Sequence, residues 1–165
     1  MSPQYAAATE VSSYKSREEI ERTLRKYGAT EFAYGSTANK ALVGCTLRHR
    51  QIRFVLQLPD PMSREFALTP SRQWRRSETD REKAWEQSVR SHWRSLYIVI
   101  KAKLEAVERG IVTFEDEFAM HTVLPGGVTV AELVTPAIEQ AYADGSPAPL
   151  LGALDRQELT TGEPL

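Results

Sequence analysis

The sequence is poor in residues that could cross-link a fold or anchor it in a membrane. Cys45 is the single cysteine among 165 residues, which excludes an internal disulfide and a cysteine-rich zinc site. It lies in an apolar run, where a reduced thiol behaves as a small hydrophobic side chain, so we expect the protein to reside in a reducing cytosol. No apolar stretch approaches the roughly 18 residues of a membrane span, and the N-terminus lacks a signal-peptide pattern. We therefore expect no membrane partner.

Signals of a catalytic or metal site are also scarce. The histidines, His49, His92 and His121, are far apart, and no two have the spacing of metal ligands. Glu117 and His121 fit one helical face, but one carboxylate and one imidazole indicate a surface pair rather than a metal site. Gly126-Gly127 lacks the Lys-Ser/Thr of a phosphate-binding loop. We expect a non-enzyme without metal or other cofactor, although an enzyme with a scattered site stays a weaker alternative.

Charge is unevenly distributed along a chain whose net charge is only -1. Residues 40–103 carry 14 Lys and Arg against six Asp and Glu, whereas residues 104–165 carry two against 11. A basic block of this kind attracts phosphate or an acidic protein surface. It binds nucleic acid only if the acidic block lies on another face. The alternative is that the two blocks neutralise each other by packing side by side.

The first half of the chain predicts a helix followed by three strands. Ser16 and Glu19 form a capping-box pattern before a helix over 17–27, which Gly28 ends. Residues 31–35, 40–48 and 51–58 are rich in β-branched, aromatic and other apolar residues and predict an antiparallel meander. Residues 1–15 show no periodicity and are expected to form a flexible arm.

The second half predicts a long helix that covers the sheet. Thr79 and Glu82 suggest its start and Gly110 its end. An apolar stripe at helical spacing runs along it through Trp85, Val89, Trp93, Leu96, Ile100, Leu104 and Val107. We expect the first five of these side chains to contact Ile52, Phe54 and Leu56.

Smaller elements complete the predicted domain. A short helix starts at Thr113, a turn surrounds Pro125-Gly-Gly, and a helix capped by Thr129 and Glu132 runs to about Ala143 with a kink or boundary at Pro136. The expectation is one α+β domain over 16–144 and a flexible tail over 145–165. The order helix, three strands, helix resembles the double-stranded RNA-binding domain and the core of single-strand annealing proteins.

Three basic elements of the middle block are candidates for nucleic-acid binding. On the long helix, four cations project along one line, beside the apolar stripe. A loop before that helix combines arginines with an aromatic ring that could stack on a base. The third element is the turn between the second and third strands. The candidate residues are Lys83, Arg90, Arg94 and Lys101; then Arg72, Trp74, Arg75 and Arg76; and then Arg48, Arg50 and Arg53. The alternatives are a solvated helix flank and a Trp74 side chain that packs on the core.

Several segments resemble a group of small proteins encoded by tailed bacteriophages and related prophages. They are Lys83-Ala-Trp-Glu-Gln-Ser88, His92-Trp-Arg-Ser-Leu96, 100–108, Thr113–Phe118 and Val123-Leu-Pro125, and the resemblance extends from Ser16 to Leu151. It implies a small phage helper protein and assigns no catalytic residues.

Two functions follow as expectations. The first is a non-enzymatic phage accessory protein of the host cytoplasm that binds nucleic acid, with single-stranded DNA as a candidate, as a helper of replication or recombination. The alternative is an inhibitor or takeover factor that binds a host protein through its acidic C-terminal half. The sequence sets no oligomeric state.

Overall fold

A computed structural model describes residues 12–37, 39–71 and 73–145. It is an α+β fold in which an N-terminal helix precedes a three-stranded antiparallel sheet, a long helix and short C-terminal helices, as expected. Most of the predicted arm and nearly all of the predicted tail lie outside the described residues, as does Arg72. Residues 12–15 are helical or cap a helix, so the predicted arm is too long at its end.

The sheet has the predicted meander order, β1 (Thr30–Ser36), β2 (Lys40–Leu47) and β3 (Arg50–Gln57). Arg48 and His49 join β2 to β3 with positive φ angles of 48° and 63°, the conformation of the tight turn whose twist matches that of the strands. Alternate side chains of β2 and β3 point to the core, and the buried ones are Ala41, Val43, Cys45, Leu47, Ile52 and Phe54. The period of two therefore gives one buried and one open sheet face.

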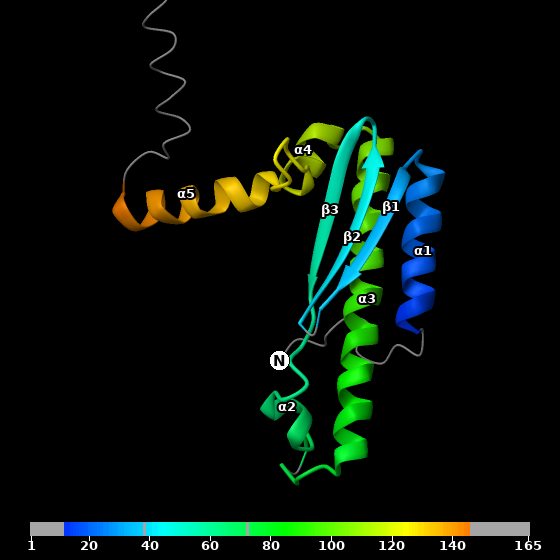
Figure 1. The fold of residues 1–165 in the computed structure, drawn as a ribbon, viewed down its shortest axis with the longest axis vertical. Coiled ribbons are helices and arrows are strands. Elements are labelled where there is room, and N and C mark those ends of the chain that lie inside the picture. Colours follow the sequence, from blue (N-terminus) through cyan, green and yellow to red (C-terminus); the bar gives the residue numbers. More distant parts are fainter. Residues whose placement is uncertain (1–11, 38, 72, 146–165) are drawn as a thin grey trace, which may run out of the picture.

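Two parallel helices cover the buried face, α1 (Ser13–Lys26) and α3 (Glu78–Glu108) (Figure 1). Trp93, Ile100 and Leu104 of α3 are buried in one cluster with Ile52 and Phe54, and Val89, Leu96 and Val107 pack against that cluster. The predicted packing of the stripe on the sheet is confirmed for Val89, Trp93, Leu96 and Ile100. Trp85 differs, because α3 extends beyond the sheet there and its indole N–H donates to the carbonyl oxygen of Pro59 at 2.9 Å.

Two helix starts were predicted wrongly. Ser12, not Ser16, caps α1 by accepting from the backbone N–H of Lys15, and Ser16 is buried in the helix. Ser77, not Thr79, caps α3 by accepting from the N–H of Asp80. In both helices the cap is a serine that precedes the predicted cap residue. The sequence pattern alone does not decide between the two candidates.

The segment between β3 and α3 contains a one-turn helix that was not predicted, α2 (Arg64–Ala67). Its Phe66 is buried, and Leu68 pairs with Arg75 in an isolated antiparallel bridge. The segment folds against the N-terminal part of α3 that extends beyond the sheet (Figure 1).

The C-terminal elements are α4 (Phe114–Phe118), the 3-10 turn η1 (Ala119–His121) and α5 (Val130–Asp144). Phe114 and Phe118 stack at 4.9 Å under the end of the sheet. The predicted turn and the capping box of Thr129 and Glu132 are confirmed. Pro136 is not a boundary, because the helix continues past it to Asp144. Among the described residues, no helix has the length and apolar character needed to cross a membrane.

Candidate nucleic-acid interface

The arginines of the β2–β3 hairpin have different surroundings. The guanidinium of Arg48 lies over the ring of Phe114 at 5.2 Å, and Arg50 is exposed. Arg53 donates from Nη2 to the carbonyl oxygen of Gly127 at 2.8 Å, and its Nη1 lies 3.7 Å from a Glu132 oxygen. Arg53 therefore ties the sheet to the loop before α5.

The four cations predicted to line α3 do not form a continuous track. Arg94 forms a short ion pair with Glu19 of α1 and also lies over the ring of Tyr97 at 4.7 Å. Arg90 donates twice to Oε1 of Gln87, at 3.2 and 2.5 Å, and its Nη1 lies 3.8 Å from Glu86. Lys83 and Lys101 are exposed. The line is thus interrupted in its middle, where α1 packs against α3.

Two of the three basic elements, the β2–β3 hairpin and the arginine loop (Trp74, Arg75 and Arg76 among the described residues), lie at opposite ends of the molecule. The β2–β3 hairpin contacts Phe114, just after the end of α3, whereas the arginine loop lies before its start. The 31 residues of α3 span about 46 Å at a rise of about 1.5 Å per residue. The hairpin and the loop are therefore not parts of one binding face (Figure 1).

The arginine loop borders a groove that the sequence did not predict. An open space of about 740 Å³ lies between α3 and the described residues 64–70 and 73–76. Phe66, Leu68 and Ala84 give it an apolar base, and Arg64, Arg76 and Gln73 bring polar groups to its rim. The α3 wall consists of Ala84, Gln87, Ser88 and Ser91. Below, "the loop groove" means this space.

Contacts with the backbone fix Arg76, which lines the loop groove, and hold Trp74, two residues before it. Arg76 donates from Nη1 to the carbonyl oxygens of Glu65 and Phe66, at 3.3 and 3.4 Å. The backbone of Trp74 bonds twice to Thr69, through Thr69 N–H to Trp74 O at 2.8 Å and Trp74 N–H to Thr69 Oγ1 at 3.0 Å. The Trp74 side chain is 64% exposed, so it does not pack into the core.

Of the two remaining candidates in this loop, the structure describes Arg75 only. Arg75 is exposed and its backbone bridges to Leu68. Arg72 lies outside the described residues. Sequence reasoning missed Arg64, Ser88 and Ser91, because the packing of α2 on α3 that brings them together leaves no periodic pattern.

Among the described residues, three acidic side chains after residue 104 form ion pairs away from the arginine loop, and one of them, Glu132, pairs with Arg53 of β3 at 3.7 Å. Glu105 binds Arg109 at 2.8 Å, and Glu117 binds Lys103 at 2.7 Å. Both pairs lie at the C-terminal end of α3, opposite the loop groove. Arg90 pairs with Glu86 of its own helix and not with these acids, but the pairs Lys103–Glu117 and Arg53–Glu132 join the acidic block to the basic block, so the two blocks are separated only in part. Glu65 does line the groove, so the groove is not purely basic.

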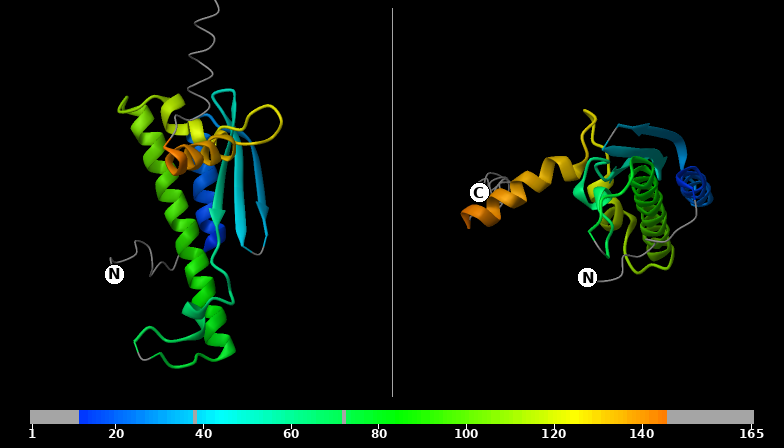
Figure 2. Two further views of the ribbon diagram at one scale, coloured as in Figure 1. Left: turned by 90° about the vertical axis from the view of Figure 1, so that its left-hand side faces the viewer. Right: turned by 90° about the horizontal axis from the view of Figure 1, so that it is seen from below.

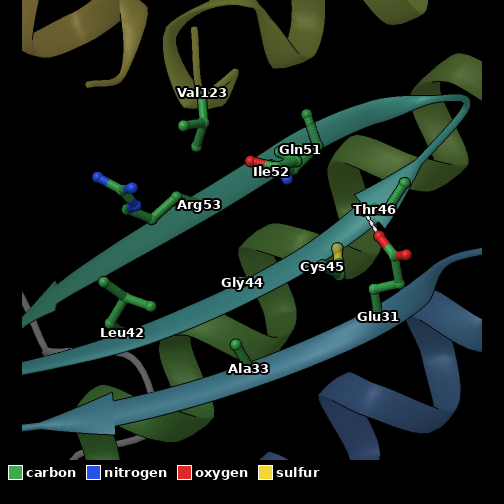
Figure 3. A pocket seen from close by; sticks show the side chains of 10 residues that line it. All are labelled: Glu31, Ala33, Leu42, Gly44, Cys45, Thr46, Gln51, Ile52, Arg53 and Val123. Atoms are coloured by element: carbon green, nitrogen blue, oxygen red, sulfur yellow. Dashed lines mark hydrogen bonds between the residues drawn. The ribbon is translucent and has the colours of Figure 1, made fainter. Parts of the chain in front are cut away.

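The open face of the sheet carries a second, smaller space of about 290 Å³, whose lining residues Figure 3 shows. Cys45 borders it, and burial raises the pKa of this thiol to about 11. The thiol is therefore protonated at neutral pH and is a poor nucleophile.

Two of the histidines have different surroundings. His121 packs against Phe54 at 4.6 Å, and Nδ1 of His92 lies 2.7 Å from the carbonyl oxygen of Ser88. Within the described ranges, no three His, Cys, Asp or Glu side chains gather as metal ligands. In comparisons with known protein families, curated proteins and solved structures, the chain matches none.

Proposed function

We propose that this chain is a non-enzymatic accessory protein of a tailed bacteriophage that binds single-stranded nucleic acid in the host cytoplasm through the loop groove. One observation carries the proposal. An open groove with an apolar base and two lining arginines lies at one end of α3, and the exposed Trp74 belongs to the segment between Gln73 and Arg76, which both line the groove. This is the combination that binds a single strand, in which both the phosphates and the faces of the bases are accessible.

Each part of the groove suits one part of a nucleotide. The guanidinium groups of Arg64 and Arg76 can contact phosphate oxygens, and Arg75, which is exposed and precedes Arg76 in the chain, adds a third cation to the same segment. The apolar base formed by Phe66 and Leu68 can take a base out of water. The volume of about 740 Å³ falls in the range of about 300 to 1,000 Å³ typical of small-ligand pockets.

The geometry favours a single strand over a duplex. A duplex would present mainly its phosphates to the loop groove, because its bases are stacked in the interior of the double helix. The loop groove would then gain little from its apolar base or from Trp74. We therefore expect tighter binding of an oligothymidylate than of a duplex of the same length at the same salt concentration.

Trp74 gives the direct test of base stacking. Trp74→Ala should weaken binding of a fluorescein-labelled oligothymidylate by about 1 to 3 kcal/mol, roughly 5- to 150-fold, because a stacked base loses its platform. Trp74→Phe should retain most of the affinity. Fluorescence anisotropy at low salt measures both.

Tyr14→Ala is the matched control, since Tyr14 is a similarly exposed aromatic residue, 63% against 64%, on α1. It should leave the affinity unchanged. Equal affinity of Trp74→Ala and the wild type would remove the stacking platform from the account. Absence of any binding by the wild type at low salt would overturn the proposed function.

A further inference from the structure

The loop groove is lined by a glutamine whose backbone conformation favours glycine. Gln73 borders the groove and has a φ angle of 54°. A residue with a Cβ atom rarely adopts a positive φ angle, because the Cβ then lies too close to a backbone carbonyl oxygen, whereas glycine adopts it without strain. Gln73 therefore places a side chain where the backbone would be less strained without one.

This conformation belongs to a turn in the segment before α3. The chain reverses between Thr69 and Trp74, beyond the sheet and beside the N-terminal part of α3 (Figure 2). Leu68 pairs with Arg75, and the N–H of Gln73 donates to the carbonyl oxygen of Thr69 at 3.0 Å. Short hairpin loops often contain one residue in the left-handed conformation, and glycine is the preferred residue there.

The side chain of Gln73 contributes little to this turn. Its Nε2 lies 3.5 Å from the carbonyl oxygen of Thr69, which is long for a hydrogen bond, and the 3.0 Å bond to Thr69 uses the backbone N–H alone. No hydrogen bond to Oε1 of Gln73 occurs among the described residues, and the side chain is exposed. Backbone strain that contacts within the chain do not offset is typical of positions that hold a ligand.

The chemistry of the groove suits the polar edge of a nucleobase at Gln73. A nucleobase that lies against Phe66 and Leu68 would turn its polar edge toward the rim, where the amide of Gln73 lies. A carboxamide presents one donor and one acceptor side by side, Nε2 and Oε1. Thymine presents the matching pair, because its O4 accepts a hydrogen bond and its N3–H donates one.

We propose that Gln73 recognises the polar edge of a nucleobase in the loop groove, a role that rests on the proposed function and extends it from phosphate contact and stacking to hydrogen bonding with the base. The ligand is then a strand whose bases have unpaired edges. In a single strand these edges are accessible, whereas in a duplex they are occupied by base pairing. Gln73 thus gives the groove a second reason to prefer a single strand.

Two strands of equal length test this role, an oligothymidylate and the same strand built from N3-methylthymidine. The methyl group removes the N3–H donor and leaves the phosphates unchanged. By fluorescence anisotropy at low salt, the wild type should bind the methylated strand about 5- to 150-fold more weakly, the range expected when a two-bond contact with a base is lost. Gln73→Gly and Gln73→Met should bind the two strands with nearly equal affinity, because neither variant has an amide. Gln73→Met keeps the length of the side chain and separates the amide from the conformation of the turn.

His49→Gly is the matched control. His49 is also exposed and has a positive φ angle, 63°, but it lies in the β2–β3 turn at the opposite end of α3. Both glycine variants should resist urea at least as well as the wild type, since relief of strain offsets the greater freedom of glycine in the unfolded chain. His49→Gly should keep the wild-type ratio of affinities for the two strands, and Gln73→Gly should lose it.

Equal binding of the two strands by the wild type, or a wild-type ratio of affinities in Gln73→Gly and Gln73→Met, would overturn the role of Gln73 and leave the proposed function standing. A marked loss of urea resistance in Gln73→Gly would also overturn it, because the side chain would then serve the turn. Failure of the wild type to bind either strand at low salt would overturn the proposed function, and the role of Gln73 with it.

Discussion

Two serines near the start of α1 have different roles, although both fit the pattern of a helix cap. Ser12 accepts the N–H of Lys15 at 3.2 Å, whereas the Ser16 hydroxyl is fully buried and meets no hydrogen-bond partner among the described residues. Ser12→Ala should therefore lower the free energy of unfolding by about 0.5 to 2 kcal/mol.

Ser16→Ala should not lower stability, because it removes a buried hydroxyl that has no partner and keeps a small side chain. Urea unfolding of both variants measures the difference. A loss in Ser16→Ala as large as that in Ser12→Ala would mean that Ser16 has a hydrogen bond that this account omits.

His121 gives a pH dependence of stability with a defined sign. Burial, and then the charge of Lys103, lower the pKa of its imidazole below the ordinary value of about 6.5. The folded state therefore binds the proton less well than the unfolded chain. Stability is fully present above about pH 6.5 and should fall as the pH drops from there through the lowered pKa.

His121→Gln should remove this part of the pH dependence, because glutamine does not titrate. The quantity to compare is the free energy of unfolding of the wild type and the variant between pH 7.5 and pH 5. If the free energy of unfolding changed with pH to the same extent in the wild type and the variant, His121 would have the same pKa in the folded and the unfolded state.

At the scale of elements, the α3 stripe is the main contact between sheet and helices. Trp93 is 5% exposed and belongs to the buried cluster. Trp93→Ala should destabilise the fold by about 3 to 5 kcal/mol, as large-to-small changes of buried aromatic residues do. Trp74→Ala, at an exposed position, should change the free energy of unfolding by less than about 0.5 kcal/mol. Equal effects of the two substitutions on chemical denaturation would contradict the assignment of the core.

Periodicity explains which elements were predictable. The alternation in β3 repeats over several residue pairs, so it predicts a strand. The stripe from Val89 to Val107 repeats over several helical turns, so it predicts a helix. α2 is a single turn whose one buried side chain, Phe66, has no period. Helix caps depend on one hydrogen bond, and a neighbouring serine or threonine can mislead the prediction, as at Thr79 and Ser77.

At the scale of the whole molecule, the basic elements that belong to one block of the sequence do not lie together in the fold. The hairpin and the arginine loop are both basic, but β3 separates them and they lie at opposite ends of α3. Helical projection placed Arg94 and Arg90 on one line, but it could not show that Glu19 of α1 would pair with Arg94. Such pairings depend on packing between elements, which the projection of a single helix does not contain.

The central claim is that the cations of the loop groove, and not those of the hairpin, contact phosphate. The salt dependence of oligothymidylate binding tests it most directly, because each phosphate contact contributes a slope of about 0.7 in log affinity against log salt on a single strand. Arg64→Gln with Arg76→Gln, the two arginines that line the groove, should reduce the wild-type slope by about 1.4. Arg48→Gln with Arg50→Gln, a double change of equal charge at the other end of the molecule, should leave it unchanged. An unchanged slope in the first variant, or an equal reduction in the second, would contradict the account.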